Sequence, residues 1–562
     1  MTSAGMVHLR RAIYAVMSLG LLIVVVAGTA CGADPSKALA QHNRAHLDAE
    51  LQHAQQMGIP KAMLQPVVSA ERKTAAGEGG WGYSYQTAAA SYASQYAQLM
   101  QVEQQSTPVL MQTATQYLGV FSTLVYARQQ DGFIEAAGYQ IRLSSAQSQL
   151  TAAKTPEAIA QVSSYALSQT KALQALVPTY DQLQAFKTSV DAMRKAGITA
   201  DWASSAYAQD LAGFRAASTP DNYLQLQHLI QGQMTQLVSD STQAAPYISS
   251  SLLAAMQGDI GRLKTYGEDA TTFQRSHDAE VKELLSARSP ADYLTLLNHV
   301  TTVRDQMAIP LARGQARYDV QALVTLVHQT SAKNWLEDYE YADSATGIGD
   351  VQMWLQQAPL QYYDNPTCGW DVACRYGQVD AQAVQMATNL RAMLQNLGDK
   401  TAASQPHQTD MQLMQGYGFT SGQVTVVSLR EQVLRAYQDG KLVYWTYITT
   451  GRTGLPTPPG VMYTMSKQTH IIFQPLGPVG PANGYPTPIN YAVNFTSPFW
   501  HQFIGYYLHD AWWRLQFGPG SNLPHYDPAA WNNGSHGCIN FPLSKMGQYY
   551  NWVQVGTPVI IY

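Results

Sequence analysis

The sequence predicts an α+β multidomain chain, with an all-α helical bundle or array in its N-terminal region followed by a β-rich domain. Over residues 35–398, apolar residues recur every three or four positions, as they do in helices with one buried face. Over residues 421–562 the pattern changes to short runs rich in Val, Ile, Tyr and Thr, separated by Gly and Pro, which is typical of strands. The length of 562 residues allows several domains, and a hydrophobic content of 46% predicts that most of the chain folds.

The charge composition argues against nucleic-acid binding. Charged residues are 13% of the chain, and 34 Lys and Arg against 38 Asp and Glu give a net charge of −4. A protein that binds nucleic acid needs a basic surface to neutralise phosphates. The composition therefore excludes nucleic acid as a partner.

The N-terminus has the layout of an export signal. Residues 12–30 carry no charge, follow Arg10 and Arg11, and end in small residues. This fits a cleaved secretory signal or an uncleaved membrane anchor, since about 19 apolar residues nearly span a bilayer. Cys31 follows at once, as in a bacterial lipoprotein signal, so a lipid anchor on Cys31 is a third reading. In each case residues 1–31 are the leader, and we expect the chain to lie in the cell envelope, secreted or tethered to the membrane.

A short pattern occurs three times in the helical region. An apolar residue and an Ala two positions before Ser or Thr precede a proline, at Pro156, Pro220 and Pro290. Ser or Thr followed by Pro marks a helix start, because the hydroxyl accepts a hydrogen bond from a free backbone N–H and Pro has none. Each interval of about 65 residues holds two long antiparallel helices, and three such units are predicted to stack into an elongated bundle or array.

Two segments are interpreted as connections. Residues 77–82 match the G-x-G-x-x-G pattern of phosphate-binding loops, but a polar stretch rather than a strand precedes them, so we expect a flexible connector. The last helix of the region is predicted over residues 380–398, with Asp380 as its cap and Gly398 as its end. The polar residues that follow, 399–420, are predicted to be a linker.

The four cysteines divide between structure and chemistry. Cys368 and Cys374 flank five residues in a turn-rich stretch, and an oxidising compartment favours a disulfide between them. So short a loop would stabilise the fold by about 2–3 kcal/mol. A metal pair is the alternative, but no His or second Cys pair lies nearby in the sequence. Cys31 belongs to the leader, so Cys538 remains as a lone thiol that needs a chemical explanation.

The lone thiol lies in the segment SHGCIN, residues 535–540. A free Cys is mostly protonated at neutral pH, so a nucleophilic Cys538 needs an imidazole partner, and His509 and His536 are the candidates. A zinc site made of these three side chains is disfavoured, because no Cys-x-x-Cys or His-x-x-x-His pair is present there. A buried structural cysteine beside packed histidines is the other alternative. We expect no metal and no organic cofactor.

The rest of the motif is expected to shape the loop around the thiol. A tight turn would direct the backbone N–H groups of Gly537 and Cys538 at the oxyanion that forms when a carbonyl is attacked, and a glycine lets that carbonyl approach. Ser535 and Asn540 are expected to hold the loop rather than react. Arg514 is expected either to pair with an acidic group of a substrate or to form a surface ion pair.

Residues 422–562 resemble the catalytic domain of the bacterial L,D-transpeptidases, the YkuD-like family. The matching segments are the motif at 535–540, the hairpin-like residues 424–452, the Thr-Pro-Pro-Gly turn at 457–460 and residues 507–511. The resemblance implies that Cys538 is the nucleophile, that His509 is the general base and that His536 supports the local hydrogen-bond network.

The spacing of the base histidine departs from the family. His509 lies further from Ser535 than the family's base histidine does, and His525 lies closer. We assign the base to His509, because residues 507–511 resemble the family's segment, whereas His525 lies among turn-forming residues. The additional residues are then predicted to form a surface loop within 519–534, where insertions cost little stability.

The resemblance also implies a substrate, the stem peptides of peptidoglycan. Cys538 would attack the carbonyl that joins the third residue of a tetrapeptide stem to its terminal D-Ala, expel D-Ala and form a thioester, which an amine then accepts. With water as the acceptor the protein would be an L,D-carboxypeptidase, and with catalysis lost it would only bind wall material. The helical region is then a spacer between membrane and wall, or a docking surface for another envelope protein.

Overall fold

The computed structural model describes residues 35–562 apart from several gaps. These are residues 79, 81, 199–200, 241–242, 332–347, 361–366, 453–454, 476–484, 500–505 and 524–532. The predicted leader with Cys31 lies outside the described residues, as does His525. The chain divides into two units, residues 1–106 and residues 107–562. Among the helices of the described residues, none combines the length and the hydrophobicity of a membrane span.

In the first unit, helical segments pack side by side. They are α2 (Pro35–Gln56), α3 (Lys61–Ala76) and the first part of α4 (Tyr85–Gln130). Arg44 on α2 forms an ion pair with Glu71 on α3 at 3.1 Å, and Gln95 on α4 donates a hydrogen bond to Thr74 on α3 at 3.0 Å. Residues 77–82 fall between α3 and α4, so a helix precedes the G-x-G-x-x-G pattern. The strand that a dinucleotide-binding loop requires does not precede it.

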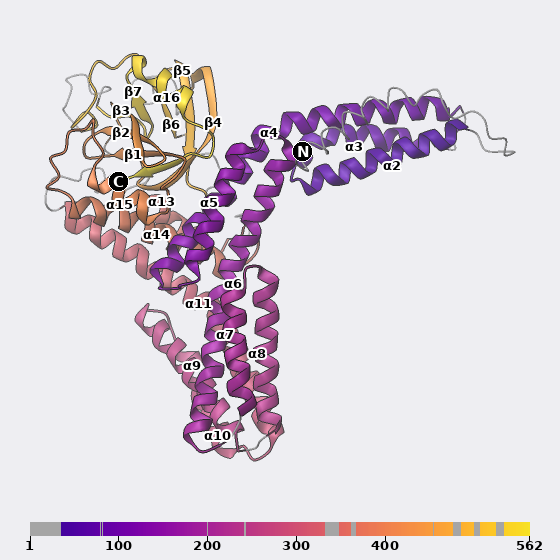
Figure 1. The fold of residues 1–562 in the computed structure, drawn as a ribbon, viewed down its shortest axis with the longest axis vertical. Coiled ribbons are helices and arrows are strands. Elements are labelled where there is room, and N and C mark those ends of the chain that lie inside the picture. The colour runs from indigo at the N-terminus through magenta and orange to yellow at the C-terminus, as the bar shows by residue number, and fades with distance from the viewer. Residues whose placement is uncertain are drawn as a thin grey trace. The chain divides into compact units, whose positions relative to one another are not determined.

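The second unit continues α4 and adds the helices that precede the sheet (Figure 1). They are α5 (Ala136–Ala152), α6 (Pro156–Lys195), α7 (Asp201–Ala216), α8 (Pro220–Asp240), α9 (Ala245–Thr265), α10 (Thr271–Ser286), α11 (Pro290–Ser331), α13 (Ile348–Gln357), α14 (Val372–Gln395) and α15 (Gln408–Gly416). Helix α6 contacts α7, α8 and α9, and α11 contacts α9, α10 and α14. The packing of the bundle therefore extends into α14.

The three helix starts predicted from the repeated pattern are confirmed. Helices α6, α8 and α11 begin at Pro156, Pro220 and Pro290. In each case the hydroxyl before the proline accepts a hydrogen bond from the backbone N–H three residues further on: Thr155 from Ala158 at 3.3 Å, Thr219 from Asn222 at 3.2 Å and Ser289 from Asp292 at 3.2 Å. Each hydroxyl thus satisfies one of the backbone donors that a helix start leaves free.

A mixed sheet forms the C-terminal part of the second unit, which confirms the predicted α+β class. Its strands are β1 (Gln423–Ser428), β2 (Val433–Gln438), β3 (Lys441–Tyr447), β4 (Gly460–Phe473), β5 (Thr487–Thr496), β6 (Tyr507–Asp510), β7 (Ile539–Phe541) and β8 (Pro558–Ile561). They are arranged in the order β3-β2-β1-β8-β4-β5-β6-β7. The pairs β1–β8 and β6–β7 are parallel, and the other pairs are antiparallel. Helix α16 (Leu543–Trp552) contacts β5 and β6.

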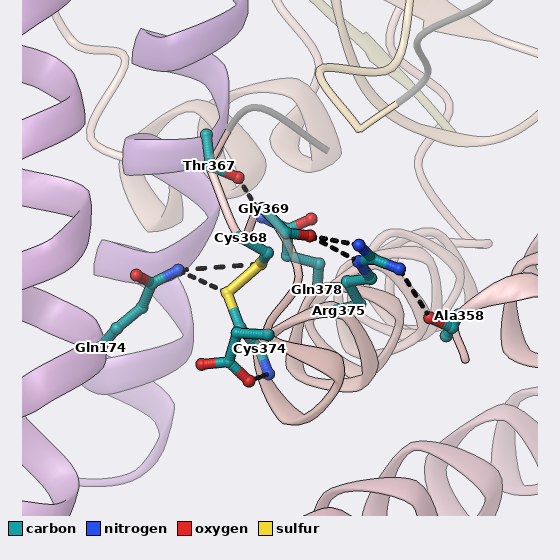
Figure 2. The surroundings of a disulfide bond; sticks show 9 residues. Gln174, Ala358, Thr367, Cys368, Gly369, Cys374, Arg375 and Gln378 are labelled. Carbon is teal, nitrogen blue, oxygen red and sulfur yellow. Dashed lines mark hydrogen bonds between the residues drawn. A yellow bond between two sulfur atoms is a disulfide. The ribbon is translucent and has the colours of Figure 1, made fainter. Parts of the chain in front are cut away.

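Helix α14 begins earlier than predicted, at a disulfide-bonded turn. Asp371, not Asp380, caps it, because the Asp371 carboxylate accepts a hydrogen bond from the Cys374 backbone N–H at 3.0 Å. Cys374 in its first turn is bonded to Cys368, and Gln174 on α6 lies 2.8 Å from the Cys374 sulfur (Figure 2). Asp380 lies inside the helix, which ends at Gln395, before the predicted end at Gly398. The prediction failed at Asp380 because a local N-cap was available upstream.

Helices α14 and α4 pack directly on the sheet. The Asn389 side chain on α14 donates to the backbone carbonyl oxygens of Gly460 in β4, at 3.1 Å, and Ile561 in β8, at 2.8 Å. A Cβ atom added to Gly119 on α4 would lie 2.6 Å from the Cβ of Pro498, so glycine is required for this close approach. The sheet and the last helices therefore share one core.

The segment predicted as a linker, residues 399–420, also packs on the sheet. It contains α15, whose Asp410 is fully buried. The Asp410 carboxylate lies 3.3 Å from the Arg435 guanidinium and accepts hydrogen bonds of 2.6 Å from the hydroxyls of Tyr437 and Tyr562. This segment differs from the expected linker, because a buried charge network holds it in place.

Candidate active site

His509 lies in β6, paired with Ala492 of β5 on one side and Asn540 of β7 on the other. Its Nδ1 is 2.8 Å from the carbonyl oxygen of Asp510. Because a carbonyl oxygen only accepts hydrogen bonds, Nδ1 carries the ring proton and Nε2 keeps a lone pair. Burial lowers the pKa of His509 to about 4, so the ring is neutral at neutral pH. This is the protonation state that a general base requires.

Asp510 holds the end of the strand that carries His509. Its buried carboxylate accepts hydrogen bonds from the backbone N–H groups of Asn490, at 2.9 Å, and Tyr491, at 2.7 Å, and from the Asn490 side chain at 3.1 Å. These bonds tie β6 to β5 and fix the carbonyl that orients the imidazole. Sequence analysis did not identify this role of Asp510. The feature that could have indicated it is an Asp directly after His509 at the end of a strand.

Cys538 directly precedes β7 and is half-buried. Burial raises the pKa of its thiol to about 11, although a hydrogen bond from the Tyr507 backbone opposes the shift. The thiol is therefore protonated at neutral pH and needs a base to become a nucleophile. The parallel register sets His509 beside Asn540, two residues after Cys538, so imidazole and thiol belong to neighbouring chain segments.

Ser535 closes the turn before the thiol. Its hydroxyl donates to the Cys538 carbonyl oxygen at 2.5 Å and accepts from the Gly537 backbone N–H at 3.1 Å. Gly537 has a φ of +100°, and an added Cβ would lie 2.5 Å from the Tyr506 ring. Glycine is therefore required there. The Gly537 N–H, which we expected to face an oxyanion, donates to the Ser535 hydroxyl within the loop in this structure.

Thr457, in the Thr-Pro-Pro-Gly turn, holds the same loop through hydrogen bonds. Its hydroxyl donates to the Gly537 carbonyl oxygen at 2.8 Å and accepts from the Gly451 backbone N–H at 2.9 Å. The side chain is 1% exposed, so these bonds are sheltered from water. Sequence analysis identified the turn but not this contact, which joins residues far apart in the chain.

Asn540 holds the loop through its backbone. Its N–H donates to the Thr449 carbonyl oxygen at 2.8 Å, and its carbonyl oxygen accepts from the Thr449 N–H at 3.0 Å. The Asn540 side chain is buried, and its Oδ1 has no hydrogen-bond partner among the described residues. The chain beyond β3 is thereby paired with β7 at the site.

His536 is only partly exposed, and it interacts with an arginine that sequence analysis did not single out. The Arg452 guanidinium donates to Nε2 of His536 at 2.9 Å, so the ring proton of His536 lies on Nδ1. Burial, followed by the positive charges of Arg452 and Arg514, lowers the pKa of His536. The ring is therefore held in its neutral form.

Arg514 is buried, with 7% of its surface exposed. Its guanidinium donates a hydrogen bond to the Gly534 carbonyl oxygen. Arg514 is therefore not a surface residue, in contrast to one of the two alternatives, and its pairing with an acidic group of a substrate stays a prediction. Its charge also contributes to the lowered pKa of His509.

Two groups of side chains in the described part of the chain have the geometry to share a metal ion, and both lie in the helical region. They are Glu50, His53 and Glu103, and Glu280, Glu283 and His299. Neither contains Cys538, His509 or His536. The choice between His509 and His525 stays a prediction, since His525 is outside the described residues.

The sheet and its loop belong to a known class of catalytic domain. Residues 422–561 match the family model of the L,D-transpeptidase catalytic domain, YkuD. The C-terminal part of this chain is therefore an L,D-transpeptidase catalytic domain, a family associated with the cell wall, as the resemblance in the sequence predicts.

Individual relatives cover the same part of the chain. Probable L,D-transpeptidase 3 of Mycobacterium tuberculosis is 35% identical over 114 residues, which are 20% of this chain and 36% of that protein. L,D-transpeptidase 1 of the same organism is 26% identical over 151 residues, 26% of this chain and 53% of that protein. The solved catalytic domain of the E. faecium L,D-transpeptidase is 30% identical, over 25% of this chain and 98% of that one, with a TM-score of 0.20. The chain thus spans about half or less of the length of these curated relatives.

Proposed function

We propose that this protein is an exported peptidoglycan L,D-transpeptidase, with Cys538 as its nucleophile and His509 as its general base. The observation that supports this most directly is the state of His509. The imidazole is neutral, its Nδ1–H donates to a backbone carbonyl, and it lies on the strand next to the segment of a protonated thiol. In this proposal Ser535, Gly537 and Asn540 hold the reacting loop.

The first half-reaction forms a thioester. Nε2 of His509 takes the thiol proton while the Cys538 sulfur attacks the carbonyl between the third stem residue and the terminal D-Ala. A carbon–sulfur bond forms, and the carbonyl oxygen becomes a tetrahedral oxyanion. The imidazolium then gives its proton to the leaving nitrogen, the carbon–nitrogen bond breaks, and D-Ala departs as a free amino acid.

The second half-reaction transfers the acyl group. An amine of another stem attacks the thioester, His509 takes the amine proton, and the carbon–sulfur bond breaks. The sulfur leaves as a thiolate that recovers the proton from the imidazolium. A 3→3 cross-link results when the amine is the side chain of another stem's third residue. The proposed roles are filled by side chains and backbone, without a metal or an organic cofactor.

Mass spectrometry of purified disaccharide tetrapeptides incubated with the full chain tests this proposal. We expect free D-Ala, peptide dimers and an acyl adduct on Cys538, and a carbapenem-type β-lactam is expected to acylate the same sulfur. Cys538→Ala should form no adduct while keeping its fold, because it removes the nucleophile and little volume. An adduct on another residue, or full turnover by Cys538→Ala, would overturn the proposal.

The same experiment separates the two alternatives. Release of D-Ala without dimers would identify water as the acceptor, and thus an L,D-carboxypeptidase. Binding of peptidoglycan without any release of D-Ala would identify a wall-binding envelope protein. The neutral imidazole next to the thiol segment favours a catalytic role over binding alone.

The location of the protein is part of the proposal. Residues 1–31 would export the chain, as a cleaved signal, as an uncleaved anchor or with a lipid on Cys31. The helical region, 35–398, would act as a spacer between membrane and wall or as a docking surface for another envelope protein. Stem peptides are the proposed partners of the catalytic domain.

A further inference from the structure

Arg452 is fixed against the loop that carries Cys538. Its backbone N–H donates to the Ser535 carbonyl oxygen at 3.0 Å, and its own carbonyl oxygen accepts from the Leu455 N–H at 2.9 Å. Its guanidinium then reaches His536, whose Nε2 it contacts at 2.9 Å. The motif loop therefore contacts both the backbone N–H and the side chain of Arg452.

The charge of Arg452 has no carboxylate partner in the described part of the chain. Its hydrogen-bond partner is a neutral imidazole, and an acceptor of that kind does not neutralise a guanidinium. The buried Arg435 of the same sheet shows the contrast, because Asp410 lies 3.3 Å from it and Glu431 lies 2.6 Å from it. Arg452 is also half-buried, so its charge is only partly solvated.

A guanidinium has five N–H donors, and one of those of Arg452 is directed at His536. Two of the others can form the pair of parallel hydrogen bonds that a carboxylate accepts. Arg514 adds a second positive charge near the same imidazole. The surroundings of His536 are thus electropositive, and this favours an anionic group of a substrate.

We propose that Arg452 binds the free terminal carboxylate of the donor stem peptide, the carboxylate of the D-Ala that leaves. This inference rests on the proposed function and deepens it, because it assigns a specificity-determining residue. Arg452 would select stems in which the residue after the scissile bond is the last one and carries a free carboxylate.

The reach of the groups agrees with this assignment. His536 and Cys538 are two residues apart, so their Cα atoms are at most about 7 Å apart. An attacking sulfur lies about 3–3.5 Å from the carbonyl carbon. The carboxylate carbon of the next residue is three bonds from that carbon, which is about 4 Å. A carboxylate in that position is within the range of a guanidinium that contacts His536.

The test compares two donors with the full-length protein: a tetrapeptide stem that ends in the D-Ala carboxylate, and the same stem that ends in a carboxamide. Acylation of Cys538 is followed by mass spectrometry, and kcat/KM for D-Ala or D-Ala-amide release is measured. We expect the wild type to prefer the carboxylate by about 10-fold or more, in line with a charge-assisted hydrogen bond.

Arg452→Gln should lower kcat/KM about 10- to 100-fold on the carboxylate donor and change it little on the carboxamide donor, so that the preference disappears. Arg452→Lys keeps the positive charge but lacks the two parallel N–H donors of a guanidinium. Its preference for the carboxylate donor should therefore lie between those of the wild type and Arg452→Gln. Arg430→Gln is the matched control, since it removes an exposed arginine of the same domain and should leave the preference unchanged.

An equal loss on both donors would overturn the proposal, because Arg452 would then only orient His536. A preference that persists in Arg452→Gln would overturn it as well. If Arg452→Gln fails to fold by circular dichroism, an unchanged preference in Arg452→Lys overturns the proposal and a reduced one supports it. If the wild type acylates neither donor, the proposed function fails together with this subsite, which is a different result from acylation without preference.

Discussion

At the candidate active site, burial acts on the Cys538 thiol and the His509 imidazole in the direction that keeps both uncharged. It raises the pKa of the Cys538 thiol to about 11 and lowers that of the His509 imidazole to about 4. In the proposed mechanism, charge therefore appears only when the proton moves from sulfur to nitrogen. The oxygen that orients His509 belongs to the backbone, so its hydrogen bond does not depend on the ionisation of Asp510.

These pKa values predict the pH dependence of acylation. A protonated His509 cannot accept the thiol proton, so the rate constant should fall below an apparent pKa of about 4 and stay level from there to neutral pH. Single-turnover acylation measured between pH 3.5 and 8 checks this. A fall centred near pH 6.5 would contradict it, because it would indicate a solvated imidazole.

The folded fraction has to be followed in the same samples. The pKa of His509 is lower in the folded protein than the ordinary value of 6.5, so the folded state binds fewer protons. The stability that this group contributes is present above pH 6.5 and is lost as the pH falls toward 4. Circular dichroism at each pH separates acid unfolding from titration of the base.

Sequence analysis identified the residues of the motif but not the residues that hold it. Cys538 was found because it was a lone thiol in a chain that the sequence predicts to be exported, and His509 was found through resemblance. The contacts of Thr457 with Gly537 and of Arg452 with His536 join residues more than 75 positions apart. Such pairings depend on the strand order, which the local patterns do not contain.

At the scale of single elements, the close contact of α4 with the sheet depends on Gly119. A Cβ there would lie 2.6 Å from the Cβ of Pro498 and 2.8 Å from the Tyr463 ring, and both neighbours are in a packed region. Gly138, inside α5, has no atom within 4 Å of an added Cβ. The two helical glycines therefore have different reasons to be glycine.

This difference makes a paired prediction. Gly119→Ala should destabilise the protein by about 1–3 kcal/mol, because the helix has to move away from the sheet. Gly138→Ala should stabilise it by about 0.5–1 kcal/mol through helix propensity alone. Urea unfolding followed by tryptophan fluorescence measures both. A stabilised Gly119→Ala variant would show that α4 does not approach the sheet this closely.

The helix starts show which elements a sequence reveals. Pro156, Pro220 and Pro290 were predicted correctly because the signal is local, a hydroxyl residue followed by proline. The start of α14 was misplaced because two aspartates had suitable contexts, and the turn that ends at Asp371 decided between them. A disulfide-bonded turn can precede a helix as readily as a loop, and the sequence does not distinguish the two.

At the scale of the whole molecule, the catalytic sheet depends on segments that lie before it in the chain. Arg435 is fully buried, and its charge is paired with Asp410 of α15. Asn389 of α14 supplies the hydrogen bonds of two backbone carbonyls in the sheet. The family match begins at residue 422 and does not include these partners.

We therefore expect a fragment of residues 421–562 to be unfolded or aggregated, while a fragment of residues 107–562 folds cooperatively. Removing α15 would take away Asp410, one of the two carboxylates that pair with the buried Arg435, and the loss of a partner from a buried ion pair costs about 3–5 kcal/mol. Near-UV circular dichroism and thermal unfolding of the two fragments check this. Equal stability of the two fragments would show that the sheet does not need the helices.

The cysteines give a second prediction at this scale. In denatured, unreduced protein, a maleimide should label Cys538 and leave Cys368 and Cys374 unlabelled, because these two are joined in the structure. Reduction before denaturation should make both available. Peptide mass spectrometry reads each cysteine separately, and labelling of the pair without reduction would contradict the structure.

Thr449 follows β3 and pairs with Asn540 of β7, and β3 and β7 are the first and last strands of the sheet order. This pairing therefore closes the sheet on itself beside the loop that carries Cys538. This closing contact is a single bridge beside the thiol, whereas the other strand pairs form longer ladders, so we expect it to open before they do. Loss of acylation would then report the earliest separation of the sheet, before its spectroscopic signal changes. Residual acylation of Cys538 would then indicate whether Thr449 and Asn540 are still paired.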